Sequence, residues 1–193
     1  MPHINYHDQE MTFKIVYYGP GMSGKTTNLV EVYKRLTDDV RGDLLTLNTA
    51  QDRTLFFDFF PIELGDIGGY VLRFNMYTVP GQIYYEASRR LILDGADGVI
   101  FIADSQPHMV EENITSFQMM CQNLASYNID WREFPIVFQY NKRDCENPIP
   151  LGTFEKTLNL DNIQITQAIA PEGKGVMETI RILAKNVISQ FQI

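Results

Sequence analysis

The sequence predicts an α/β fold, in which a mostly parallel central sheet is flanked by helices on both faces. Apolar strand-like runs alternate with amphipathic helical stretches along the chain, which is typical of parallel strands joined by crossover helices. The runs 98–103 and 135–140 are apolar almost throughout, as expected for strands buried on both faces. A glycine-rich turn joins the first central run to a helix, a strand–turn–helix unit that is common in folds of this class.

The strand predictions rest on short apolar runs that are bounded by turn residues. The expected strands are residues 13–18, 43–47, 55–60, 70–78, 98–103, 135–140 and 165–169. Apolar and polar side chains alternate in 70–78, as in a strand with one buried face, and the glycines of 65–69 predict a turn before it. Ile4 and Tyr6 leave two alternatives for the first twelve residues, an extra N-terminal edge strand or a loose tail.

The helix predictions rest on apolar residues spaced three and four positions apart. The expected helices are residues 25–36, 84–93, 110–124, 153–158 and 176–191. The clearest apolar stripe consists of Val110, Ile114, Phe117, Cys121 and Leu124, and a similar stripe of Val176, Ile180, Leu183, Val187 and Phe191 closes the chain. No repeat or linker interrupts this order, so we expect one domain over residues 1–193.

Composition and charge limit the function classes. The chain has 193 residues and a net charge of −8, which argues against a general nucleic-acid binder because phosphate backbones require a basic face. Cys121 and Cys145 lack metal-ligand spacing and fit a reducing compartment. No apolar run approaches membrane-spanning length, and no lipidation signal is present. We therefore expect a cytoplasmic protein with no direct membrane anchor.

The first stretch that predicts chemistry is Gly19-Pro20-Gly21-Met22-Ser23-Gly24-Lys25-Thr26-Thr27, which matches the phosphate-loop pattern G-x-x-x-x-G-K-[ST]. Glycines let backbone N–H groups approach phosphate oxygens, and the start of the following helix adds a partial positive charge. Lys25 is predicted to reach the β- and γ-phosphates, and the Thr26 hydroxyl is predicted to ligate Mg²⁺. The predicted phosphate-binding residues are Gly19, Gly21, Met22, Ser23, Gly24, Lys25, Thr26 and Thr27.

A second polar segment, Asn141-Lys142-Arg143-Asp144, follows the predicted strand 135–140 at the edge of the sheet where such folds bind ligands. The Asp144 carboxylate can accept hydrogen bonds from N1–H and the exocyclic amine of guanine, a donor pair that adenine lacks. Asn141 is predicted to tie this segment to the phosphate loop, and the Lys142 stem is predicted to lie against the base. Asp104 and Ser105, after the strand 98–103, are predicted to cap a helix.

The order of these segments resembles the Ras-like small GTPase superfamily over residues 13–191. Four separated segments are more specific and resemble the MglA family, bacterial Ras-like small GTPases that set cell polarity and motility. They are Tyr18-Gly19-Pro20-Gly21, Asp52-Arg53-Thr54-Leu55-Phe56-Phe57-Asp58-Phe59, Tyr77-Thr78-Val79-Pro80-Gly81-Gln82 and Gln139-Tyr140-Asn141-Lys142-Arg143-Asp144. The resemblance implies a Ras-like P-loop GTPase domain that binds GTP and GDP with Mg²⁺ and hydrolyses GTP as a molecular switch.

The resemblance also implies roles for residues in two switch segments. Gly81 corresponds to the glycine that offers a backbone N–H to the γ-phosphate, and Gln82 corresponds to the glutamine that orients the attacking water. Thr54 corresponds to the switch threonine that ligates Mg²⁺. From the residues alone, Arg53 has two alternatives, a solvated loop residue or an arginine finger supplied in cis. The resemblance favours the finger, and Lys25 completes the catalytic set.

Two positions depart from the superfamily pattern. Thr78 stands where most phosphate-loop GTPases have an aspartate near Mg²⁺, so the sequence predicts a metal held more weakly than usual. Pro171 replaces a lysine next to Ala170, whose backbone N–H is predicted to bind guanine O6. These departures leave open a nucleotide-locked scaffold with little turnover. A phosphate-loop kinase is a further alternative, but it leaves residues 141–144 unexplained.

Partners follow from the resemblance alone. A roadblock-fold GTPase-activating protein of the MglB type is expected to remodel Arg53 and Gln82, so intrinsic hydrolysis is expected to be slow. Polarity and motility effectors are expected to bind through residues 49–60 and 82–93, which relax when the γ-phosphate is lost. The same partners are expected to recruit the protein to a cell pole.

Overall fold

The computed structural model describes residues 2–46, 57–81 and 85–191 of the chain. Its strands are β1 (His3–Asn5), β2 (Glu10–Tyr18), β3 (Leu45–Thr46), β4 (Asp58–Ile67), β5 (Tyr70–Thr78), β6 (Gly98–Asp104), β7 (Ile136–Asn141) and β8 (Gln164–Gln167). Its helices are α1 (Lys25–Arg35), α2 (Glu86–Leu93), α3 (Val110–Ala125), α4 (Thr153–Leu158) and α5 (Val176–Gln190), with short 3₁₀ turns η2 (Pro107–Met109) and η3 (Ala170–Glu172). None of the described helices is long and apolar enough to cross a membrane.

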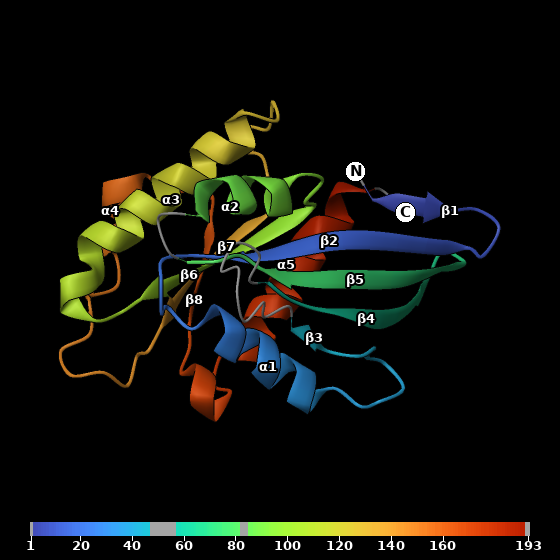
Figure 1. Cartoon of the computed structure of the whole chain (residues 1–193), viewed down its shortest axis with the longest axis horizontal. Coiled ribbons are helices and arrows are strands. Elements are labelled where there is room, and N and C mark those ends of the chain that lie inside the picture. The colour runs from blue at the N-terminus through green and yellow to red at the C-terminus, as the bar shows by residue number, and fades with distance from the viewer. Residues whose placement is uncertain (1, 47–56, 82–84, 192–193) are drawn as a thin grey trace.

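The strands form one sheet in the order β3-β4-β5-β2-β6-β7-β8 (Figure 1). β5, β2, β6, β7 and β8 are parallel to one another, whereas β4 runs antiparallel to both β3 and β5. The sheet therefore has the predicted, mostly parallel form. β1 pairs antiparallel with the first residues of β2, which confirms the extra N-terminal strand rather than the loose tail.

Helices cover both faces of the sheet, as predicted. α1 and α5 pack on one face, while α2, α3 and α4 lie on the other (Figure 1). The alternation of side chains along β2 serves both faces, because successive residues of a strand point to opposite sides. Phe13, Ile15 and Tyr17 join the core under α1 and α5, and Val16 and Tyr18 join the core under the other helices.

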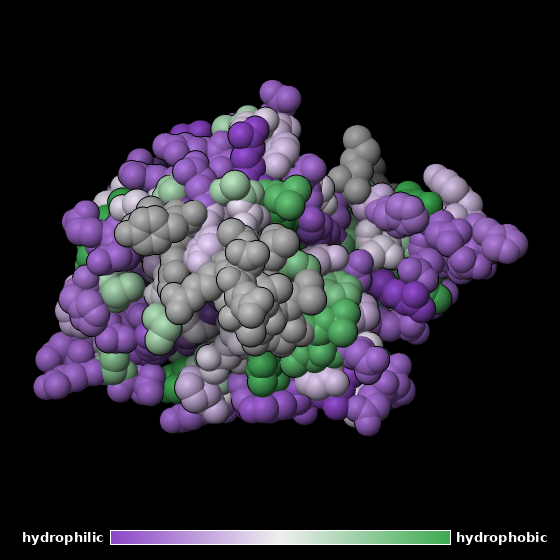
Figure 2. All heavy atoms as spheres, in the orientation of Figure 1, coloured by the Kyte–Doolittle hydropathy of each residue, from purple (hydrophilic) through white to green (hydrophobic). Residues whose placement is uncertain are grey.

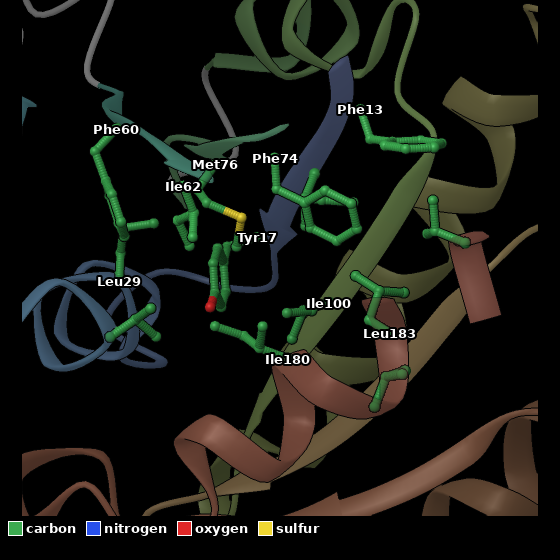
Figure 3. Close-up of a cluster of buried hydrophobic side chains, with 14 of the residues drawn as sticks. Phe13, Tyr17, Leu29, Phe60, Ile62, Phe74, Met76, Ile100, Ile180 and Leu183 are labelled. Carbon is green, nitrogen blue, oxygen red and sulfur yellow. The ribbon is translucent and has the colours of Figure 1, made fainter. Parts of the chain in front are cut away.

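The first of these cores is shown in Figure 3, where β2, β4 and β5 side chains meet Leu29 of α1 and Ile180 of α5. Phe60 of β4 is fully buried there, so this aromatic residue of the predicted partner segment packs in the core. The face shown in Figure 2 is mostly hydrophilic, but hydrophobic residues gather over β3 and β4 beside the segment drawn in grey. Leu45 of β3 is 54% exposed.

The predicted extent of the strand at 55–60 is wrong. Residues 55 and 56 lie outside the described part of the chain, and β4 runs from Asp58 to Ile67, through most of the predicted turn. Gly65 forms a β-bulge against β5 at a φ of 98°, which a glycine adopts without strain, and the chain reverses only at Gly68 and Gly69. β8 ends earlier than predicted, at Gln167, and β3 begins later than predicted, at Leu45; residue 47 of the predicted strand 43–47 lies outside the described residues.

We predict that Gly175→Ala lowers the free energy of unfolding much more than Gly152→Ala does. Both glycines are helix N-caps with a positive φ, 74° at Gly175 and 87° at Gly152. A Cβ at Gly175 would lie 1.9 Å from the main-chain oxygen of Gln167, whereas nothing lies within 4 Å at Gly152. The left-handed backbone costs about 1 kcal/mol in either variant, and the clash adds at least about 2 kcal/mol at Gly175. Urea unfolding measures both losses, and equal losses would contradict the clash.

Candidate functional site

Five loops meet at one edge of the sheet, because β2, β5, β6, β7 and β8 are parallel and their carboxyl ends point the same way (Figure 1). They are residues 19–24, 79–81, 105–106, 141–144 and 168–170. Every described residue that the sequence predicts for the site lies in these loops or in the first turn of α1. Arg53, Thr54 and Gln82 lie outside the described residues, so their roles stay predictions.

The shape of the phosphate loop requires glycine at two positions, because a side chain at either one would clash with a neighbouring group. Gly19 has a φ of 146°, and a Cβ there would lie 2.3 Å from the main-chain oxygen of Ile102. Gly24 has a φ of 97°, and a Cβ there would lie 2.4 Å from the Asn141 amide nitrogen. No described side chain caps α1, which begins at Lys25. The N–H groups of its first turn are therefore left for another acceptor, and an anion suits them.

Lys25 places a buried positive charge at the same point. Its Nζ donates hydrogen bonds to the main-chain oxygens of Gly19 and Pro20, at 3.0 and 2.6 Å. None of the ion pairs between described residues includes Lys25. Burial, and then the nearby charge of Arg89, lower the pKa of Lys25 to about 7. A phosphate group fits this place, because its negative charge would offset both effects.

Gly81, in the loop after β5, lies directly against the phosphate loop. A Cβ on Gly81 would lie 2.6 Å from both the Gly21 Cα and the Lys25 Nζ. The Gly81 backbone is therefore close to any group that Lys25 binds, and a side chain at position 81 would push the two loops apart. A cleft of about 530 Å³ opens beside this contact, between the phosphate loop and the side chains of Arg89 in α2 and Met119 in α3.

A carboxylate that no sequence pattern indicated lies beside Thr26. Asp58, the first residue of β4, is 6% exposed. Its Oδ2 accepts hydrogen bonds from the hydroxyls of Thr26 and Thr78, at 2.7 and 3.2 Å. Its main-chain N–H donates to the Thr78 hydroxyl at 2.8 Å. Only the strand pairing could have revealed it, because β4 is antiparallel to β5 and its first residue meets the carboxyl end of β5.

A metal at this edge would depend on hydroxyl and phosphate oxygens as well as on Asp58. Among the described residues, no group of three or more His, Cys, Asp or Glu could hold a metal ion. Mg²⁺ does not require such a cluster, since this hard cation is commonly bound by one or two carboxylates together with the phosphates of a ligand. The Thr26 hydroxyl next to the Asp58 carboxylate fits such a site.

Asn141 connects the phosphate loop to the loop after β8. Its Nδ2 donates to the main-chain oxygen of Ser23 at 2.8 Å, which is the tie that the sequence predicts. Its Oδ1 accepts the main-chain N–H of Ala170 at 3.1 Å. The N–H that is predicted to bind guanine O6 is therefore engaged within the protein in this structure, and its role toward a base stays a prediction.

Lys142 is held by a carboxylate that is predicted above to cap a helix. Its Nζ lies 2.6 Å from Oδ2 of Asp104, whose side chain is almost fully buried. The predicted cap at Asp104 and Ser105 is wrong, because Gln106 and Met109 occupy the N-cap positions of η2 and α3. Asp104 ends β6 beside the end of β7, so its carboxylate meets the loop after β7 instead.

The segment predicted to read a base is fixed on one side of the phosphate loop. The Arg143 main-chain N–H donates to the main-chain oxygen of Ala168 at 3.2 Å, and the ion pair to Asp104 holds the Lys142 stem. Asp144 is exposed, three residues after Asn141. This arrangement leaves the Asp144 carboxylate open to a planar ligand with two adjacent donors, while the phosphate loop accepts the phosphates of the same ligand.

Two known proteins that the chain resembles bear on this site. The chain is 48% identical over 192 residues to the mutual gliding-motility protein MglA of Myxococcus xanthus (strain DK1622), and the match covers 100% of this chain and 98% of that protein. It is 29% identical over 145 residues to the GTP-binding nuclear protein GSP1 of Encephalitozoon cuniculi (strain GB-M1), covering 72% of this chain and 58% of that protein. No protein-family model matches the chain.

We predict that GDP binding at pH 8 takes up a proton at Lys25. The free protein holds the pKa of Lys25 at about 7, below its usual value, so most of its amines are neutral at pH 8. A bound phosphate raises that pKa again, and the amine gains up to one proton per GDP. Calorimetry in two buffers with different ionisation enthalpies measures the uptake. Lys25→Arg serves as the control, because a guanidinium does not titrate in this range and the uptake should vanish. Equal heats in both buffers for the unchanged protein would contradict the prediction.

Proposed function

The chain belongs to the MglA family of Ras-like small GTPases, and we propose that it acts as a GTP/GDP switch in the control of cell motility and polarity. As a member of this family it binds GTP and GDP with Mg²⁺ and hydrolyses GTP to GDP and phosphate. What we propose beyond these family properties is that it acts as a switch, which partners it binds and where in the cell it is recruited. The proposal adds that intrinsic hydrolysis is slow, near the rate of Ras itself at about 10⁻⁴ s⁻¹, until a partner engages.

The observation that carries the proposal is the hydrogen bond from Asn141 Nδ2 to the Ser23 main-chain oxygen, at 2.8 Å. It fixes the distance between the loop that suits phosphates and the segment that ends at Asp144. A guanine nucleotide has its base and its phosphates at the two ends of one molecule, and a rigid offset between the two loops suits that shape. A ligand with phosphates alone would leave the Asp144 side of the site without a role.

Hydrolysis is assigned to residues on both sides of the γ-phosphate position. Lys25 and the Gly81 backbone N–H are the described members, and Arg53 and Gln82 are added from the family resemblance. Gly81 supports this assignment, because a Cβ there would lie 2.6 Å from the Lys25 Nζ. For Mg²⁺, we propose Thr26 as a ligand from α1 and Thr54 as a ligand from the switch segment.

Partners are proposed to bind through residues 49–60 and 82–93, of which the structure describes 57–60 and 85–93. Phe57 and Phe59 are half-buried, and both rings contact Tyr77 of β5, at centroid distances of 6.0 and 4.7 Å. Leu91 of α2 is 63% exposed. Apolar side chains that are exposed or half-buried in these two segments favour a protein partner. We propose a roadblock-fold GTPase-activating protein as one such partner, and recruitment to a cell pole through effectors that bind the same surface.

Asp144→Asn tests the choice of base. We expect the affinity for GDP to fall about 100-fold, because the substitution removes two charge-assisted hydrogen bonds to the base. Affinity for xanthosine diphosphate should rise, since xanthine offers an acceptor where guanine has its amine. Competition against fluorescent GDP measures both constants. Glu146→Gln removes another exposed carboxylate of the same loop and should leave the preference unchanged. A variant at position 144 that still prefers guanine would contradict the assignment.

Arg53→Ala tests the arginine finger. GDP binding should stay intact, while partner-stimulated GTP hydrolysis should fall about 10³-fold, as when a finger is lost from other small GTPases. Arg53→Lys keeps the charge but not the planar fork, and it should restore little of the rate. Single-turnover phosphate release with a roadblock-fold partner measures the effect, with Arg132→Ala as a surface control. Unchanged release after Arg53→Ala would exclude the residue from catalysis.

A further inference from the structure

We propose that Asp58 supplies the carboxylate of the Mg²⁺ site. It would replace the aspartate that most phosphate-loop GTPases have at the position of the neutral Thr78. The inference rests on the proposed function in one respect, namely that a bound nucleotide brings Mg²⁺ to Thr26. It replaces the expectation of a weakly held metal that follows from Thr78 alone. The missing charge is supplied by the neighbouring strand rather than by β5.

The strand pairing explains how Asp58 reaches this place. β4 is antiparallel to β5, with Phe59 opposite Tyr77, so Asp58 lies across from Thr78 at the end of the ladder. Thr78 accepts the Asp58 main-chain N–H at 2.8 Å and donates its own hydroxyl proton to Asp58 Oδ2 at 3.2 Å. This pair of bonds fixes both the backbone and the carboxylate of Asp58. Thr78 is therefore a positioning residue.

The contact with Thr26 gives the carboxylate its role. Thr26 Oγ1 donates to Asp58 Oδ2 at 2.7 Å. A hydroxyl has one proton and two lone pairs. Because the Thr26 hydroxyl directs its proton toward the Asp58 carboxylate, its lone pairs are directed away from that carboxylate. Those lone pairs are what a metal ion requires. Partners of this kind, which orient a ligand and add negative charge near the ion, commonly change metal affinity 10–100-fold.

The surroundings of Asp58 also favour a cation. The residue is 6% exposed, and the ion pairs between described residues do not include it. Its described side-chain partners, Thr26 and Thr78, are neutral hydroxyls. A buried carboxylate with only neutral partners carries a desolvation cost that a divalent ion offsets. The competing explanation is a simple tether, in which Asp58 joins β4 to α1 and has no effect on metal.

The test moves the carboxylate from one strand to the other. GDP release from the full-length protein is measured with a fluorescent GDP analogue while free Mg²⁺ is titrated against EDTA. Asp58→Asn should raise the Mg²⁺ concentration that gives half-maximal slowing of release by about 10–100-fold. The double variant Asp58→Asn/Thr78→Asp returns a carboxylate to the site from β5, and it should bring that concentration back close to the wild-type value. Asp66→Asn, on an exposed residue of the same strand, is the matched control and should behave as wild type.

Mn²⁺ binding, followed by electron paramagnetic resonance in the presence of GDP, gives the metal affinity without any turnover, and the same order of variants is expected. Melting temperatures in EDTA separate the tether from the metal site. If Asp58→Asn lowers stability equally with and without metal and the double variant restores nothing, the residue is a tether and the inference is overturned. An unchanged Mg²⁺ titration in Asp58→Asn also overturns it and leaves the proposed function intact. A wild-type protein that does not retain GDP would overturn both.

Discussion

The site depends on one buried amide. Asn141 is almost fully buried, and its two ends bind the main chain of Ser23 and of Ala170. The Asn141 side chain packs directly against the phosphate loop, since a Cβ on Gly24 would lie 2.4 Å from the Asn141 Nδ2. Three loops from separate strands are thereby held in one arrangement. A side chain that satisfied only one of these partners would leave a buried polar group unpaired, at a cost of about 1–3 kcal/mol.

A second buried polar network reaches the same glycine, Gly24. Asn28 of α1 donates to the Gly24 main-chain oxygen and accepts from Gln139 of β7, and Gln139 in turn accepts from Thr179 of α5. Thr179 is also 2.8 Å from Thr166 of β8. The network joins the helix that follows the phosphate loop to two strands and to the helix behind them. A fully satisfied network of this kind adds rigidity, and rigidity is what a fixed offset between base and phosphates requires.

Two buried carboxylates at this edge, Asp104 and Asp58, show how topology distributes charge. Asp104 comes from the parallel strand β6 and holds Lys142, whereas Asp58 comes from the start of the antiparallel strand β4 and meets Thr26. Both reach the edge because of the direction in which their strands run. The chain can therefore carry a neutral threonine at the end of β5 and still have a carboxylate beside α1.

The sequence by itself determined the phosphate loop, the segment 141–144 and the order of strands and helices, because each is set by local backbone needs or by the spacing of apolar residues. It did not determine the extent of β4. A glycine such as Gly65 predicts a turn from the sequence, and only the pairing with β5 shows that it forms a β-bulge within a strand. Nor did it reveal the contacts of Asp58 and Asp104, which meet Thr26 and Lys142 across 32 and 38 residues of chain. Such contacts have no local signature. They arise only when the pairing of β4 with β5 and of β6 with β7 brings the ends of those strands together.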